Sequence, residues 1–249
     1  MSGHSKWSTI KHKKAALDAK RGKVFTRVIK ELTVSAKVGG GDPDGNPRLR
    51  SAIAEAKAAN MPADNIKRAI MKGTGELPGT VYEDVVYEGY GTGGVAIYVE
   101  VLTDNKMRST PEIRHLFTKH GGDLGQPNSV SWMFEKKGQF AIPDSATSEE
   151  RLMDVVLEAG ADDIQASEDS FEVTCASGVF SQVQDALEKA GIVPSHAKLA
   201  MIPTTVVDLD AKKAGQCLKL LEALEDHDDV QNVYANLSFD DDAVSEAAS

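Results

Sequence analysis

The stretch Thr74-Gly75-Glu76-Leu77-Pro78-Gly79-Thr80 divides the chain into two parts with different periodicity. Glycine and proline at this density break regular structure, so the stretch is predicted to be a linker. Apolar residues recur at helical spacing before it and at roughly every second position after it. The sequence therefore predicts an α+β protein whose helical part comes first.

The part before the linker is predicted to form a bundle of three helices. Apolar residues from Phe25 to Ala36 define the first helix, which Gly39-Gly40-Gly41 ends. Asn46 is an N-cap residue, and proline follows it at the first position of a second helix that runs to about Ala59. A third, short helix is expected from Pro62 to Gly73.

The part after the linker is predicted to alternate strands and helices. Residues 137–203 have the order β-α-β-β-α-β, which is the ferredoxin-like order. Strands are also expected at 81–90, 95–103, 129–134, 206–209 and 230–239, with helices at 111–120 and 215–225.

Charge is distributed unevenly along the chain. The whole sequence has a net charge of −10. Residues 1–80 carry 16 basic and 7 acidic residues, a net charge of +9, whereas residues 81–249 carry 12 and 31, a net charge of −19. A basic unit attached to an acidic body indicates an anionic partner for the basic unit alone.

No motif for catalysis or for a cofactor is found. The glycines from Gly89 to Gly94 match GxGxxG, but a strand follows them where a dinucleotide site needs a helix, so they are interpreted as a hairpin turn. The six histidines and two cysteines have no metal-ligand spacing. We expect no enzyme activity, no cofactor, no metal and no small-molecule substrate. With no long apolar run, no membrane contact is expected, and the location is predicted to be cytoplasmic.

The first helix has a basic face opposite its apolar face. Opposite the apolar residues on a helical projection lie Lys20, Lys23, Arg27, Lys30 and Lys37. A helix in plain solvent usually mixes both charge signs, so a face of one sign suggests a nucleic-acid phosphate backbone as partner. The alternative is a solvated helix without a partner.

The segment before this helix is also basic and carries one aromatic residue. It contributes Lys6, Lys11, His12, Lys13 and Lys14, together with Trp7. Lysine supplies phosphate contacts, and Trp7 either stacks on an unpaired base or anchors the segment to the bundle.

These residues resemble the beginning of the YebC/PmpR family. The resemblance continues through nearly the whole chain, in the motifs Gly3-His4-Ser5-Lys6-Trp7, Asn46-Pro47-Arg48-Leu49-Arg50, Tyr87-Glu88-Gly89-Tyr90-Gly91 and Met201-Ile202-Pro203. It implies three domains: a basic helical bundle at 1–76, a discontinuous α+β domain at 81–136 plus 204–240, and a ferredoxin-like domain inserted at 137–203.

The resemblance also implies a function in gene expression. The first hypothesis is a DNA-binding transcriptional regulator. A helix-turn-helix interpretation would then place the third helix, with Lys67, Arg68 and Lys72, in the major groove. The alternative is a translation factor that binds ribosomal RNA and relieves ribosomes stalled on proline-rich nascent chains. The candidate nucleic-acid-binding residues are Lys6, Trp7, Lys11, His12, Lys13, Lys14, Lys20, Arg21, Lys23, Arg27, Lys30, Arg48 and Arg50.

Overall fold

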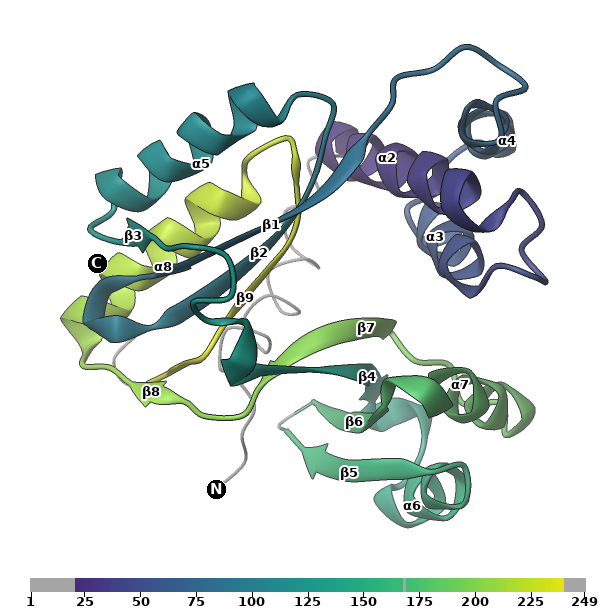
Figure 1. Ribbon diagram of the computed structural model, residues 1–249. Coiled ribbons are helices and arrows are strands. Elements are labelled where there is room, and N and C mark those ends of the chain that lie inside the picture. The colour runs from purple at the N-terminus through teal and green to yellow at the C-terminus, as the bar shows by residue number, and fades with distance from the viewer. Residues whose placement is uncertain (1–20, 168, 240–249) are drawn as a thin grey trace. The chain divides into compact units, whose positions relative to one another are not determined.

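The computed structural model describes residues 21–167 and 169–239 of the 249-residue chain. Within these residues the fold divides into two compact units: residues 134–204 form one unit, and the chain before and after them forms the other. The larger unit contains a bundle of helices and a four-stranded sheet with its own helices (Figure 1).

Three described helices form the bundle, in agreement with the sequence: α2 (Arg21–Gly39), α3 (Pro47–Ala58) and α4 (Ala63–Gly73). The amide of Asn46 caps α3 by accepting a hydrogen bond from the Leu49 N–H at 3.1 Å. Val28, Leu32, Leu49 and neighbouring small residues form a buried core between the helices.

Gly73 allows α4 to end directly against α2. A Cβ atom at this position would lie 2.3 Å from the backbone oxygen of Thr33, which is too close for any side chain. The C-terminal end of α4 therefore approaches the middle of α2 at backbone distance.

The sheet of the larger unit has the strand order β3-β1-β2-β9, and all neighbouring strands are antiparallel. Its strands are β1 (Glu83–Tyr90), β2 (Ala96–Thr103), β3 (Asp123–Leu124) and β9 (Val230–Ala235). The glycine run between β1 and β2 forms the hairpin turn that the sequence predicts, with Gly93 and Gly94 at positive φ. Because β2 pairs with β9, segments far apart in the chain share one sheet.

Two helices, α5 (Lys106–Lys119) and α8 (Ala211–Glu225), cover one face of this sheet (Figure 1). Ile97, Val99 and Val101 of β2 point toward them with the period of two expected for a strand. Phe117 of α5 and Leu220 of α8 complete the core. A short parallel pair, β8 (Val207–Asp208) with β10 (Leu237–Ser238), completes this unit.

Two expectations from the sequence are wrong at the borders of elements. The helix expected to begin at Pro111 begins at Lys106, because Asn105 supplies an N-cap that accepts from the Arg108 N–H. The strand expected at 129–134 is instead a 3-10 turn over Ser131–Met133, after which a strand begins at Phe134.

The smaller unit has the order β4 (Phe134–Pro143), α6 (Glu149–Glu158), β5 (Ala161–Ala166), β6 (Ser170–Ala176), α7 (Phe180–Lys189) and β7 (His196–Pro203). This is the expected β-α-β-β-α-β order, and the antiparallel sheet has the strand order β5-β6-β4-β7. Phe140 of β4 stacks on Phe180 of α7 with ring centroids 4.8 Å apart, inside a core to which both helices contribute.

Candidate nucleic-acid interface

More than half of the candidate binding residues lie outside the described residues or have no described side chain. The residues outside the described range are Lys6, Trp7, Lys11, His12, Lys13, Lys14 and Lys20. Arg21 is the first residue of α2, and its side chain is not described. The structure describes the side chains of the remaining five candidates, Lys23, Arg27, Lys30, Arg48 and Arg50.

The basic face of α2 lies against an acidic segment of the same unit, residues 225–229, which we call the acidic loop. Lys23 Nζ lies 2.9 Å from Asp226 Oδ1 and also donates to the backbone oxygen of that residue. Arg27 donates to the backbone oxygen of Glu225. The basic face thus has an anionic partner inside the protein.

Lys30 is the most deeply buried member of this face. Its Nζ lies 2.7 Å from Asp229 Oδ1 and 2.9 Å from the backbone oxygen of Asp228. Only 6% of Lys30 is exposed, so the expectation of a solvent-facing stripe is wrong at this position. Removing one partner of such a buried pair costs about 3–5 kcal/mol, which makes Lys30 a determinant of the fold.

Asp229 collects several donors around one carboxylate. Arg108 Nη2 at 2.7 Å, Ser109 Oγ at 2.8 Å and Thr103 Oγ1 at 3.1 Å all donate to Oδ2, while Lys30 donates to Oδ1. Burial by itself would raise the pKa of Asp229, but the hydrogen bonds from Lys30, Arg108 and Ser109 outweigh burial and hold that pKa well below its usual range. The carboxylate is therefore ionised at neutral pH.

Arg48 and Arg50 also have partners within the protein. Arg48 forms a two-point contact with Glu31, at 2.6 Å and 3.0 Å, and reaches Asp84 at 3.1 Å. These hydrogen bonds, that to Glu31 above all, raise the pKa of Arg48. Arg50 donates to the backbone oxygens of Pro43 and Asp44, which stabilises the turn before α3.

A second set of basic residues in the bundle has no acidic partner in the part of the chain that the structure describes. Each is exposed, and none forms an ion pair with an acidic side chain between residues 21 and 239 as described: Lys37, Lys57, Lys67, Arg68 and Lys72. Of these, Lys67, Arg68 and Lys72 belong to the helix of the helix-turn-helix interpretation. The two sets differ in their partners: the first set pairs with acidic side chains and backbone oxygens from other parts of the fold, which a projection of one helix does not reveal.

Helices α3 and α4 are joined by a fixed turn of residues 59–62. Asn60 has a positive φ of 57°, and the Met61 N–H donates to the Ala56 backbone oxygen at 2.9 Å. Met61 is buried in the bundle core. Two helices with a short turn between them are the components of a helix-turn-helix motif, in which the second helix contacts DNA.

Other kinds of site find little support in the described residues. Burial raises the pKa of Cys175 to about 11 and that of Cys217 to about 12, so neither thiol is a nucleophile at neutral pH. No cluster of His, Cys, Asp or Glu side chains suited to a metal ion occurs between residues 21 and 239, the uncertain position 168 aside. Among the same residues, every helix is too short or too polar to cross a bilayer.

The architecture defines an α+β protein with an N-terminal part of three helices followed by β-sheet domains. Residues 5–76 match the family described as the TACO1/YebC protein N-terminal domain, and residues 82–237 match the TACO1/YebC second and third domain. The chain belongs to the TACO1/YebC family.

Relatives and a solved structure resemble the chain over nearly its full length. A protein of Acidobacterium capsulatum named "probable transcriptional regulatory protein" is 59% identical, with 100% of both chains covered. One of Desulfosudis oleivorans with the same name is 57% identical over 99% of this chain and 100% of its own. The crystal structure of a conserved hypothetical protein from Aquifex aeolicus matches with a TM-score of 0.84 and 46% identity, covering 90% of this chain and 93% of that one.

Proposed function

We propose that the protein is a DNA-binding transcriptional regulator whose bundle contacts the double helix through α4. The observation that carries the proposal is the surface of α4. Lys67, Arg68 and Lys72 are exposed there, while Ile66 and Ala69 of the same helix face the bundle core. The core thus fixes the orientation of the basic side chains.

The chemistry of these side chains suits DNA. The recognition helix of a helix-turn-helix contacts base edges with residues near its N-terminus, and Arg68 lies in the second turn of α4. Arginine pairs with guanine through two hydrogen bonds, whereas lysine at Lys67 and Lys72 suits phosphate. The names of the relatives agree with a role in transcription.

The charge of the remainder of the chain supports the same surface. Residues 81–249 have a net charge of −19 and repel a polyanion, whereas residues 1–80 have a net charge of +9. Nucleic acid is therefore expected to approach the bundle.

The test is a binding titration of the full chain with a 20-bp duplex over a range of salt concentrations. Lys67→Gln/Arg68→Gln should weaken binding through the loss of one base contact and one phosphate contact, and the phosphate contact of Lys67 should account for a reduction of about 0.9 in the slope of log K against log salt. Both positions are exposed, so each change should alter stability by less than about 0.5 kcal/mol. Lys106→Gln/Lys119→Gln on α5 removes the same charge outside the bundle and serves as the control.

Unchanged binding by the α4 variant would disprove the assignment of this surface, and absence of binding by the wild-type chain would disprove the function. Crosslinking in cells followed by sequencing of the bound nucleic acid separates the two hypotheses. Promoter DNA supports the transcriptional regulator, and ribosomal RNA supports the translation factor.

We further propose the three-domain division with boundaries 1–76, 81–136 plus 204–240, and 137–203, the last domain being ferredoxin-like. The pairing of β2 with β9 supports a discontinuous middle domain. The strand order β5-β6-β4-β7 supports the ferredoxin-like assignment of the inserted segment. We also propose a cytoplasmic location, supported by two free, buried cysteines.

A further inference from the structure

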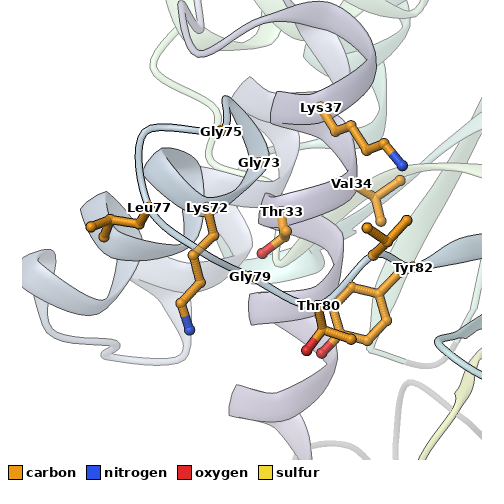
Figure 2. A pocket seen from close by; sticks show the side chains of 11 residues that line it. Thr33, Val34, Lys37, Lys72, Gly73, Gly75, Leu77, Gly79, Thr80 and Tyr82 are labelled. Atoms are coloured by element: carbon orange, nitrogen blue, oxygen red, sulfur yellow. The ribbon is translucent and has the colours of Figure 1, made fainter.

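We propose that a groove between α2, α4 and the linker binds one unpaired nucleotide, with its base at Tyr82 and the phosphates on its two sides at Lys37 and Lys72, whose amino groups point to opposite sides of the groove (Figure 2). The inference rests on the proposed function, since it assumes that the bundle binds nucleic acid. It adds a distinct site that contacts a single strand. This site shares Lys72 with the exposed surface of α4 that would contact a duplex, and its aromatic part, Tyr82, lies outside that surface.

The groove is lined by side chains from three segments (Figure 2). Val34 and Lys37 come from α2, Lys72 comes from α4, and Thr80 and Tyr82 come from the end of the linker. Its volume is about 260 Å³. Pockets for complete small ligands hold about 300–1,000 Å³, so this groove suits one unit of a longer chain.

Glycines in the linker keep the groove open. A Cβ atom at Gly79 would lie 3.0 Å from the Lys72 Cβ, so a larger residue would push against the lysine stem. Gly75 has a φ of +84°, a conformation that favours glycine. The two glycines thus let the linker backbone pass close to α4, and Leu77 between them contributes its side chain to the lining.

The two lysines provide positive charge that no acidic side chain among the described residues neutralises. Lys37 and Lys72 form no ion pair with an acidic side chain in the described part of the chain. Each lies in the last turn of its helix, where the helix dipole contributes about half a negative charge. Two full positive charges exceed these two halves, so the groove stays positive and suits a phosphate.

Tyr82 gives the groove an aromatic surface. Lys30 Nζ lies 5.6 Å from the centre of its ring, a cation–π contact that helps to fix the ring. The charge of Lys30 is already neutralised by Asp229, so Lys30 orients Tyr82 without being a phosphate ligand. Val34 and Val81 add apolar surface beside the ring.

The combination favours a nucleotide over a simple anion. An inorganic phosphate needs only the lysines, whereas a base gains by stacking on an aromatic ring. Bases within a duplex are stacked on their neighbours and their faces are not available. The groove is therefore expected to distinguish single strands from duplexes.

The test measures fluorescence anisotropy of the full chain with two probes, a fluorescein-labelled dT10 strand and a labelled 20-bp duplex. Tyr82→Leu should weaken binding of dT10 by about 5- to 150-fold, as expected for the loss of one stacked base, and leave duplex binding within about twofold. Tyr82→Phe keeps the ring and should bind dT10 as the wild type does.

The lysines are tested in the same experiment. Lys37→Gln/Lys72→Gln should reduce the salt slope on dT10 by about 1.4, at roughly 0.7 per phosphate contact on a single strand. Lys106→Gln/Lys119→Gln makes the same change of charge on α5 and should leave the slope unchanged. The lysine variants keep the test informative if Tyr82→Leu does not fold.

Each outcome bears on the proposal in a defined way. The groove would be overturned if Tyr82→Leu weakened binding of both probes equally, or if Tyr82→Leu and the lysine variant both bound dT10 as the wild type does. Duplex binding by the wild type would still support the proposed function in either case. Failure of the wild type to bind either probe would overturn both.

Discussion

Asp229 shows how one residue links the bundle to the sheet. Its carboxylate is held ionised by Lys30 from α2 and by Arg108 and Ser109 from α5. A carboxyl group with a lowered pKa in the folded state stabilises the fold above its unfolded pKa of about 3.9. That contribution is lost as the pH falls through the folded pKa.

We predict that Asp229→Asn lowers the free energy of unfolding at pH 7 by about 3–5 kcal/mol, because Lys30 loses its buried partner. The difference from the wild type should narrow as the pH falls below about 4, by up to ~1.4 kcal/mol per pH unit. Urea unfolding at pH 7, 4 and 3 measures both quantities. A difference that stays constant over this range would contradict the assigned role.

Asn46 connects two elements, since it caps α3 and also closes the end of α2. Its Nδ2 group donates to the backbone oxygens of Ser35 at 2.8 Å and Gly40 at 2.9 Å, and its Oδ1 accepts from the Leu49 N–H. Gly39 is required beside it, because a Cβ atom there would lie 2.6 Å from the Asn46 amide.

We predict that Asn46→Ala destabilises the bundle by about 3 kcal/mol. The cap contributes about 1 kcal/mol, and the remainder comes from backbone oxygens left without a donor. Asn46→Ser should recover only the cap. Hydrogen exchange of the α3 amides, with the strand amides of the 134–204 unit as an internal reference, provides the measurement. Protection in Asn46→Ser or Asn46→Asp as strong as in the wild type would argue against the two donor contacts.

The sequence predicts elements well where one segment contains all the information. The helices of the bundle, the β1–β2 hairpin and the β-α-β-β-α-β order follow from periodicity, glycine positions and caps. The sequence places the start of α5 at Pro111 because proline is typical of the first position of a helix, whereas Asn105 is the actual cap and the helix begins at Lys106. Residues 129–134 were assigned to a strand although their first part turns before β4 begins.

The candidate interface was less predictable. Lys30 alternates with apolar residues as an exposed lysine would, and only the fold shows that Asp229 lies against it. A helical projection treats everything outside the apolar face as solvent, so it cannot anticipate a partner 199 positions later in the chain. Conversely, Lys72 and Tyr82 become neighbours in a groove only once the linker has folded back along α4.

At the scale of the whole molecule, we expect the acidic loop to compete with nucleic acid for the basic face of α2. Asp226 and Asp228 are exposed members of this loop, and Asp226 pairs with Lys23. An external phosphate must displace these contacts or bind elsewhere on the bundle. The loop is therefore expected to reduce the affinity of the complete chain for nucleic acid through its negative charge.

We predict that Asp226→Asn/Asp228→Asn strengthens binding of the full chain to a 20-bp duplex, by up to about tenfold in 50 mM salt and progressively less as salt screens the charges. Asp154→Asn/Asp185→Asn makes the same change on exposed positions of α6 and α7 and controls for net charge. Equal strengthening by both variants would mean that only total charge matters.

The pairing of β2 with β9 also sets an order of events during synthesis. Residues 104–229 separate the two strands. At a synthesis rate of ~5–20 residues per second, about 6–25 s therefore pass between the synthesis of the last residue of β2 and that of the first residue of β9. The 134–204 unit leaves the ribosome complete within that interval, because all its strands pair with one another. Until Val230 emerges, one edge of β2 lacks its neighbour and the α2 lysines lack the acidic loop. Premature termination between residues 205 and 225 therefore yields a chain with the 134–204 unit complete and a basic remainder that lacks both β9 and the acidic loop.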